Sequence, residues 1–219
     1  MHTEREEYWQ PLAHELVRSL EQQGIADAAV LDAMQRVPRH EFIPDATLES
    51  AYRDCAMQLS KGQTISQPFI VAIMTQLLDA KPGQRVLEIG CGSGYQAAVL
   101  LELGVELVSV ERFPSLASAA RQRLAARYDA DRFEIVEGDG SLGHPDGAPY
   151  DRILVTAAAP RPPLPLRRQL ADPGRMVLPL GDRAGQKLCV LELLDGTWTQ
   201  HESTPCRFVP LVGEHGFDG

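Results

Sequence analysis

The sequence predicts a doubly wound α/β fold: a mostly parallel sheet with an antiparallel carboxyl-terminal edge and a helical amino-terminal extension. Between residue 85 and about residue 180, short apolar runs alternate with segments of helical character. Such alternation is typical of strands joined by right-handed helical crossovers, which make a sheet parallel. One apolar run leads directly into a glycine-rich turn, Gly90-Cys91-Gly92-Ser93-Gly94. A strand, a tight glycine turn and a helix let a nucleotide-like ligand approach the backbone at the end of a parallel strand.

Residues 1–55 are predicted to be a helical extension that packs on the core. Leucine recurs at every fourth position near the start of the chain, at Leu12, Leu16 and Leu20. That spacing places the three side chains on one face of a helix. Asp27 can cap a second helix over 29–37, which Pro38 then ends.

Residues 56–219 are predicted to form the core, in one compact domain with the extension. A polar loop over 60–68 precedes an apolar helix over 69–78. Five apolar runs are predicted to be strands of the sheet: 86–89, 107–110, 133–136, 152–156 and 175–178. Three helices are predicted between these strands: 95–103, 115–127 and 164–171. Two antiparallel edge strands, joined by an Asp195-Gly196 turn, are predicted in the tail: 186–193 and 206–211.

Two acids stand where a nucleoside would need them. Glu111 ends the second predicted strand, 17 residues after Gly94, and can accept hydrogen bonds from both hydroxyls of a ribose. Asp139 lies between two glycines after the third strand and can meet an adenine amino group, with an ordinary Asp-Gly turn as the alternative. Tyr95 stands where the dinucleotide fingerprint requires a third glycine or alanine, and no Gly-Lys-Ser/Thr closes the loop. The motif therefore matches neither the dinucleotide fingerprint nor a P-loop, and a glycine turn without any ligand is the alternative to a nucleoside site.

The composition narrows the class of protein. The 219 residues carry a net charge of −9 and a pI of about 5.1, which argues against nucleic acid as a partner. The four cysteines lack CxxC spacing and indicate free thiols in a reducing compartment. The six histidines have no metal-ligand spacing, so no metal is expected. The charged start is unlike a signal peptide and no apolar run reaches membrane-spanning length. We therefore expect a cytoplasmic protein with no membrane partner, and a monomer.

Several segments match the pattern of a known family. The Gly-x-Gly-x-Gly turn at 90–94 is similar to the cofactor loop of class I methyltransferases, whose ligand S-adenosylmethionine has a ribose and no phosphate. Five further segments match as well: 37–44, 62–68, 138–140, 156–160 and 208–211. Among them, the sequences Thr-Ile-Ser-Gln-Pro and Thr-Ala-Ala-Ala-Pro discriminate, because generic methyltransferases lack them. Over roughly residues 30–217 the chain resembles the protein-L-isoaspartate O-methyltransferases, which implies a Rossmann-like methyltransferase fold.

The resemblance implies an activity and a set of residues. The activity is transfer of a methyl group from S-adenosylmethionine to the free α-carboxyl of L-isoaspartyl residues in damaged proteins and peptides. The ester then closes to a succinimide, and hydrolysis returns some normal aspartate. The residues implied around the cofactor are Gln63, Thr64, Ile65, Ser66, Glu88, Gly90, Cys91, Gly92, Gly94, Glu111, Asp139 and Gly140. The residues implied around the substrate are Thr64, Ser66, Ala157, Ala158 and Ala159, with Ser66 as the catalytic residue.

The chemistry of a carboxylate fits these residues. A carboxylate is ionised at pH 7 and is already nucleophilic, so it needs donors and positioning rather than a general base. Thr64 and Ser66 are such donors. Ser66 also stands two residues before Pro68, where the alternative role is an N-cap. Cys91 has two possible roles, a reactive thiol or a small inert turn residue. Two other functions stay open: a relative that methylates an ordinary aspartyl or a small carboxylic acid, and a non-catalytic S-adenosylmethionine-binding module.

Overall fold

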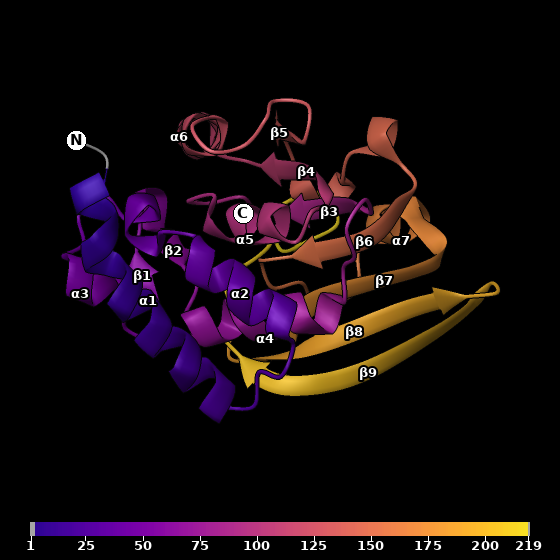
Figure 1. Cartoon of the computed structure of the whole chain (residues 1–219). Helices are drawn as coiled ribbons and strands as arrows, with labels where there is room; N and C mark the ends of the chain where they lie inside the picture. Colours follow the sequence, from indigo (N-terminus) through magenta and orange to yellow (C-terminus); the bar gives the residue numbers. More distant parts are fainter. Residues whose placement is uncertain (1–2, 219) are drawn as a thin grey trace.

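The computed structural model describes residues 3–218 and contains a seven-stranded sheet flanked by helices (Figure 1). The strands, in spatial order, are β5 (Phe133–Glu137), β4 (Glu106–Glu111), β3 (Arg85–Ile89), β6 (Tyr150–Val155), β7 (Leu170–Gly181), β8 (Gln186–Leu194) and β9 (Thr197–Cys206). Neighbours from β5 to β7 pair parallel, whereas β7, β8 and β9 pair antiparallel. The predicted doubly wound α/β class with an antiparallel edge is confirmed.

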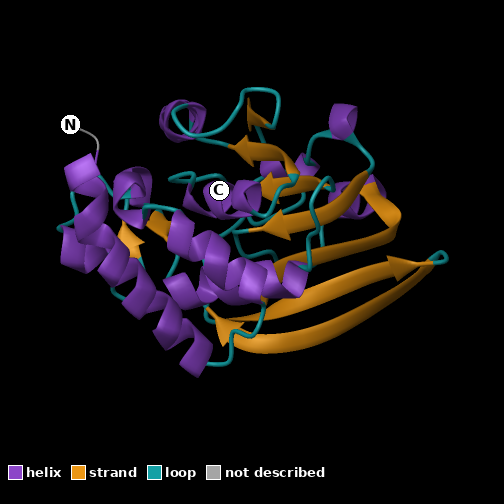
Figure 2. Ribbon diagram, in the orientation of Figure 1, coloured by secondary structure: helices purple, strands orange, loops and turns teal. Residues whose placement is uncertain are grey.

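Helices cover both faces of this sheet (Figure 2). They are α1 (Thr3–Gln22), α2 (Ala28–Arg36), α3 (Leu48–Ala51), α4 (Pro68–Leu78), α5 (Tyr95–Glu102), α6 (Pro114–Ala125) and α7 (Leu164–Gln169). Successive side chains of a strand point to opposite faces. Val86 of β3 accordingly belongs to a core cluster shared with α1, α2, α4 and α5, while Leu87 and Ile89 belong to a second cluster shared with α7. The middle of the sheet is therefore buried on both sides.

The order of the strands fixes where a ligand can enter. From β3 the chain winds outward through β4 to β5, and then returns to the other side of β3 with β6. The connections that leave the carboxyl ends of β3 and β6 therefore diverge, and open a crevice at that edge of the sheet.

The last strand of the sheet lies elsewhere than predicted. The structure forms β9 over Thr197–Cys206, not over 206–211, so that expectation is wrong. The Asp195-Gly196 turn, with both residues at positive φ, closes a two-residue hairpin in which Leu194 already opposes Thr197. Because β9 is an edge strand with mostly exposed residues, it does not need the apolar run on which the prediction rested.

The neighbouring strand is also longer than predicted. β7 begins at Leu170 and runs to Gly181, so it takes the end of the predicted helix 164–171 and extends well beyond 175–178. Asp172 and the adjacent Pro173 lie inside this strand, next to the hairpin turn, where both carboxylate oxygens of Asp172 accept amide hydrogens from residues 195 and 196. The pairing of β7 with β8 begins directly after this proline, at Gly174 and Leu193.

The amino-terminal helices share the core of the sheet. α1 contacts α2 and α4, and α2 contacts α4 and α5. Leu16 and Leu20 are buried, and the Asp27 carboxylate accepts hydrogen bonds from the amides of Ala29 (2.9 Å) and Val30 (3.3 Å), as expected for the predicted cap. One core cluster continues through these helices and the sheet, so the division at residue 55 stays a prediction. Within residues 3–218, no helix has the combination of length and apolar character that crossing a membrane demands.

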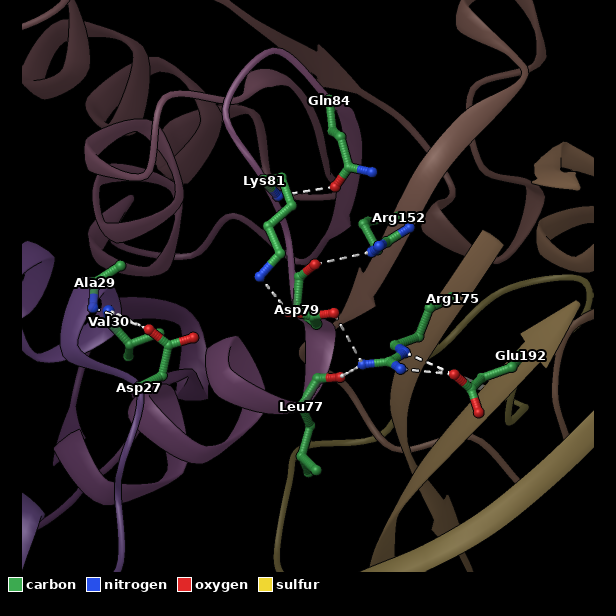
Figure 3. A network of polar contacts seen from close by, with 10 residues as sticks. All are labelled: Asp27, Ala29, Val30, Leu77, Asp79, Lys81, Gln84, Arg152, Arg175 and Glu192. Carbon is green, nitrogen blue, oxygen red and sulfur yellow. Dashed lines mark hydrogen bonds and ion pairs between the residues drawn. The ribbon is translucent and has the colours of Figure 1, made fainter. Parts of the chain in front are cut away.

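A polar network ties the carboxyl end of α4 to the sheet (Figure 3). The guanidinium of Arg175 contacts Glu192 at 2.6 Å and donates to the carbonyl of Leu77 at 3.1 Å. Arg152 donates to the carbonyl of Asp79 at 3.3 Å, and the Asp79 carboxylate lies 2.5 Å from Lys81 Nζ and 3.7 Å from Arg175. These contacts fix one end of α4, while its other end reaches the crevice.

Candidate active site

A cavity of about 200 Å³ lies at the carboxyl ends of β3, β4 and β6. Five segments, distant in sequence, line it: 62–66, 89–93, 110–112, 156–157 and 209–212. Further lining residues come from the helices α4 and α5 and from the start of a 3₁₀ turn: Val71, Met74, Tyr95, Gln96 and Gly140. The cavity therefore joins the glycine turn at 90–94 and the polar loop at 60–68, which holds the predicted substrate residues Thr64 and Ser66 and is called the substrate loop below.

The glycine turn can take its shape only with glycine at its first position. Gly90 has a φ of +96°, and a Cβ there would lie 2.5 Å from Thr156 Oγ1. That hydroxyl donates to the carbonyl of Gly90 at 2.7 Å and so joins the ends of β3 and β6. Gly92 and Gly94 also have positive φ, and Gly94 caps α5 without lining the cavity. The turn thus exposes backbone to the cavity without side chains in the way.

Glu111 lies at the end of β4 with only 5% of its surface exposed, and it lines the cavity. One carboxylate oxygen accepts the amide of Gly92 at 2.9 Å, and the other accepts the amide of Phe113 at 2.9 Å. A carboxylate oxygen can accept two hydrogen bonds, so each retains a free acceptor position. Two free acceptor positions on one carboxylate fit a ligand with two neighbouring hydroxyls, such as a ribose.

Glu88 lies away from the cavity. Its side chain points to the same face of β3 as that of Val86, which is the face covered by α1, α2, α4 and α5. It is fully buried and does not line the cavity. Ser109 donates to its carboxylate at 2.5 Å. Burial raises the pKa of Glu88 to about 8, helped by the charge of Glu111 and opposed by the Ser109 hydrogen bond. The structure therefore does not bring this predicted cofactor residue to the site, and it holds a carboxyl group that is mostly protonated at pH 7.

Cys91 lines the cavity, but its thiol is buried. Burial, and then the charge of Glu88, raise the pKa of Cys91 well above its usual range. A thiol that stays protonated is a weak nucleophile. The geometry therefore favours the small inert turn residue over the reactive thiol. Within the described residues, no three His, Cys, Asp or Glu side chains gather in a way that could hold a metal ion.

Asp139 lies beside the cavity without lining it, whereas Gly140 does line it. The Asp139 carboxylate accepts from the amide of Ser141 (2.8 Å), the hydroxyl of Ser141 (2.7 Å) and the amide of Glu214 (2.8 Å). Burial alone would raise the pKa of Asp139, but these hydrogen bonds outweigh it and hold the pKa below its usual range. Asp139 thus organises the 3₁₀ turn and the tail, and one acceptor position of Oδ2 stays free for an amino group.

The substrate loop reaches the cavity through a small hairpin. β1 (Met57–Gln58) and β2 (Thr64–Ile65) pair antiparallel, and Gln63, Thr64, Ile65 and Ser66 all line the cavity. Ile65 is buried and anchors the hairpin, while Thr64 is exposed and Ser66 is half-buried.

The N-cap of α4 is not Ser66. The helix begins after Gln67, and Asp54 receives the amide of Phe69 at 2.8 Å and the side-chain amide of Gln67 at 3.0 Å. A carboxylate from a distant turn therefore caps this helix. The hydroxyl of Ser66 is released from the capping role that the sequence left open, and it is available to a ligand in the cavity.

The three alanines after β6 do different things. Ala157 lines the cavity, whereas Ala158 and Ala159 are buried and do not. Ala158 pairs with the tail instead: its amide donates to Val209 at 2.8 Å, and its carbonyl accepts from Leu211 at 2.7 Å. These bonds bring residues 209–212 to the cavity wall. The sequence matched this tail to a family motif but did not assign it to the site, and it also missed Tyr95, Gln96 and Arg112.

The fold and the cavity define a class I methyltransferase, with its cofactor turn after the central strand β3 and its acid after β4. The chain belongs to the protein-L-isoaspartate(D-aspartate) O-methyltransferase family, whose family model matches residues 12–216. A protein-L-isoaspartate O-methyltransferase from Methanoregula boonei is 51% identical over 89% of each chain. One from Hyperthermus butylicus is 46% identical over 98% of this chain and 94% of that protein. A solved protein-L-isoaspartate O-methyltransferase structure, 28% identical, superposes with a TM-score of 0.84 over 93% of this chain and 67% of the other.

Proposed function

We propose that this protein is a protein-L-isoaspartate O-methyltransferase. It transfers a methyl group from S-adenosylmethionine to the free α-carboxyl of L-isoaspartyl residues in damaged proteins and peptides. The observation that carries the proposal is the shared cavity: the loop with Thr64 and Ser66 and the turn from Gly90 to Gly92 line the same space. A module that only binds the cofactor would need the turn alone, whereas methyl transfer needs cofactor and substrate side by side.

The chain would hold the cofactor through its backbone and one acid. Gly90 and Gly92 supply a surface without side chains, and Glu111 accepts the ribose hydroxyls. The amide of Gly140 and the carboxylate of Asp139 border the position assigned to adenine. Bound there, S-adenosylmethionine supplies a methyl group on a positively charged sulfur.

The chain's own work on the substrate is to position a carboxylate. An isoaspartyl carboxylate is ionised at neutral pH, so no residue has to remove a proton from it. Moving it out of water is costly unless donors replace the lost solvent, and the hydroxyls of Ser66 and Thr64 are the donors on this wall. Holding the nucleophilic oxygen in line with the transferred methyl group can supply about 7–11 kcal/mol of the barrier reduction.

The test of the reaction is a matched pair of peptides, one isoaspartyl and one aspartyl. The two differ by the placement of one methylene in the backbone, which displaces the carboxylate relative to the methyl donor. We expect the isoaspartyl peptide to be methylated far better. Near-equal turnover would contradict the repair function and support a relative that methylates ordinary aspartyl residues.

Kinetics of Ser66→Ala test the catalytic assignment. Because Asp54 caps α4, the substitution should leave the melting temperature nearly unchanged. Loss of a donor to a charged group, worth about 1.5–3 kcal/mol, should lower kcat and kcat/KM together by about ten- to a hundred-fold. Affinity for S-adenosylhomocysteine should stay near that of the wild type. A lower melting temperature with unchanged kinetics would assign Ser66 to the fold instead.

The setting of the enzyme follows from its thiols and its substrates. Cys55, Cys91, Cys189 and Cys206 are all free, which supports the cytoplasm as a reducing compartment. In this proposal, the partners are isoaspartyl proteins and peptides. The enzyme is a monomer and binds neither nucleic acid nor membranes. Gel filtration, and gel-shift and vesicle-binding assays at physiological salt, check these three properties.

A further inference from the structure

Arg39, the largest fully buried side chain of the described residues, has no assigned role. Arg39 is 0% exposed, in a 3₁₀ turn that follows α2. Charged side chains are almost never fully buried unless they are paired, because burial removes their hydration. Burial accordingly lowers the pKa of Arg39. None of the described carboxylates forms an ion pair with it.

Two of the three contacts of Arg39 lead to the cavity wall. Nη2 donates to the backbone carbonyl of Ser66 at 2.8 Å, and Nε donates to the carbonyl of Ala51 at 3.0 Å. The guanidinium carbon lies 4.6 Å from the centre of the Tyr95 ring. Ser66 and Tyr95 line the cavity, but Arg39 does not. Arg39 therefore stands directly behind the wall and touches it at two points.

One guanidinium thus joins the substrate loop to the cofactor side of the cavity. Tyr95 is the first residue of α5, immediately after the glycine turn, and Ser66 ends the substrate loop. The planar fork of arginine can donate to two carbonyls in different directions while its face rests on an aromatic ring, which a lysine cannot do at once. A buried positive charge behind Ser66 also favours a negative group on the other side of the wall.

We propose that Arg39 is a positioning residue for methyl transfer, which fixes the carbonyl of Ser66 against Tyr95 and so sets the distance between substrate loop and cofactor turn. The inference rests on the proposed function, since it assigns Arg39 an action through Ser66. Ser66→Ala keeps the backbone carbonyl that Arg39 holds and removes only the hydroxyl, so an effect of Arg39 that acts by placing this hydroxyl should disappear in that variant.

The test is a double-mutant cycle with Arg39→Lys and Ser66→Ala on an isoaspartyl peptide. Arg39→Lys alone should lower kcat/KM at least ten-fold, while affinity for S-adenosylhomocysteine in calorimetry stays within two-fold. In the double variant, kcat/KM should be no more than about two-fold below that of Ser66→Ala. Losses that multiply, or kinetics of Arg39→Lys within two-fold of the wild type, would overturn the proposal. So would a matching loss of cofactor affinity.

Two further variants protect the test from a folding defect. Arg39→Gln removes the buried charge and keeps one donor group. It replaces Arg39→Lys in the cycle if that variant does not fold, and the same kinetic pattern is expected. Arg132→Lys is the matched control: its guanidinium donates to the carbonyl of Leu101 at 2.8 Å, away from the cavity. Arg132→Lys should lower the melting temperature, leave kcat/KM within two-fold of the wild type, and give an independent effect beside Ser66→Ala.

The cycle also separates this inference from the proposed function. If the wild-type protein does not methylate the isoaspartyl peptide but methylates another carboxylate, the proposed function is wrong. The double-mutant cycle would then be measured with that carboxylate as the substrate. If Arg39→Lys slows the enzyme and Ser66→Ala does not, Arg39 does not act through Ser66 and the inference is wrong.

Discussion

The carboxylates around the cavity are held very differently from those at the carboxyl end of α4. At that end, Asp79 and Glu192 contact Lys81 and Arg175, and charge meets charge (Figure 3). At the cavity and next to it, Glu111 and Asp139 are held by backbone amides and a hydroxyl, and neither has an ion-pair partner among the described side chains.

The difference shows which region is built for stability and which for a ligand. An ion pair offsets the charge of a carboxylate, as the Arg175 guanidinium does with Glu192 through two bonds to Oε1. A carboxylate held by amides keeps its charge and some lone pairs, and both are then open to hydroxyls and to a positively charged sulfur. Changes at the two regions should therefore separate stability from function.

The largest effect is expected at Glu88, through pH. Its pKa is about 8 in the fold and near 4.5 in an unfolded chain, so the folded protein binds the extra proton between these values. The contribution of Glu88 to stability is complete below pH 4.5 and is lost as pH rises toward 8, by up to about 1.4 kcal/mol per pH unit. Glu88→Gln should remove this slope, so that the variant gains on the wild type with rising pH. Urea unfolding at pH 5 to 8.5 measures the difference, and parallel curves for the two proteins would contradict it.

Glu111→Ala should weaken cofactor binding by about 1–3 kcal/mol, because two amides and the ribose hydroxyls lose their acceptor. Calorimetry with S-adenosylhomocysteine on the folded variant measures this loss. Unchanged affinity would show that Glu111 only holds the turn.

Arg175→Met should have the opposite signature. It removes the contacts to Glu192, to Leu77 and to Asp79, and about a quarter of the arginine side chain is exposed, so we expect a loss of about 2 kcal/mol in unfolding free energy. The kcat/KM of the variant should stay within two-fold of the wild type. A kinetic defect at full stability would mean that the two ends of α4 are not separate.

Asp54→Ala should have the smallest effect, about 1 kcal/mol of stability, which is the usual loss for an N-cap. Thermal melting beside Ser66→Ala decides which residue is the cap. If Ser66→Ala lowers the melting temperature and Asp54→Ala does not, the assignment of the cap is wrong.

The sequence predicted most of what depends on apolar runs and turn residues. The strands of the parallel region, the Asp27 cap and the Asp195-Gly196 turn are local features, and the structure has them. It did not predict β9, because an exposed edge strand needs pairing partners and not apolar residues. It also left Ser66 ambiguous, since the true capping acid lies 15 residues before Phe69 and becomes its neighbour only in the folded chain.

The site was predictable only to the level of its segments. Glu88 and Glu111 lie on the same face of neighbouring strands, because Glu88 pairs with Ser109, but Glu111 comes two residues later and reaches the open edge beyond the end of β3. The wall formed by residues 209–212 depends on backbone pairing with Ala158, which has no signature in residue types. An arginine such as Arg39 is expected at the surface from its residue type, and its complete burial is evident only from the packing of the folded chain.

The five segments of the cavity wall make the ligand a partner in folding. The unfolded chain has no site at all, because residues 62–66 and 209–212 come together only in the native state. Cofactor binding therefore raises the free energy of unfolding, by about 2.7 kcal/mol when free S-adenosylhomocysteine is at a hundred times its Kd. In a cell, bound cofactor would therefore stabilise the folded enzyme. Starvation for methionine lowers the cofactor concentration, so it would both stop the reaction and shorten the lifetime of the folded protein.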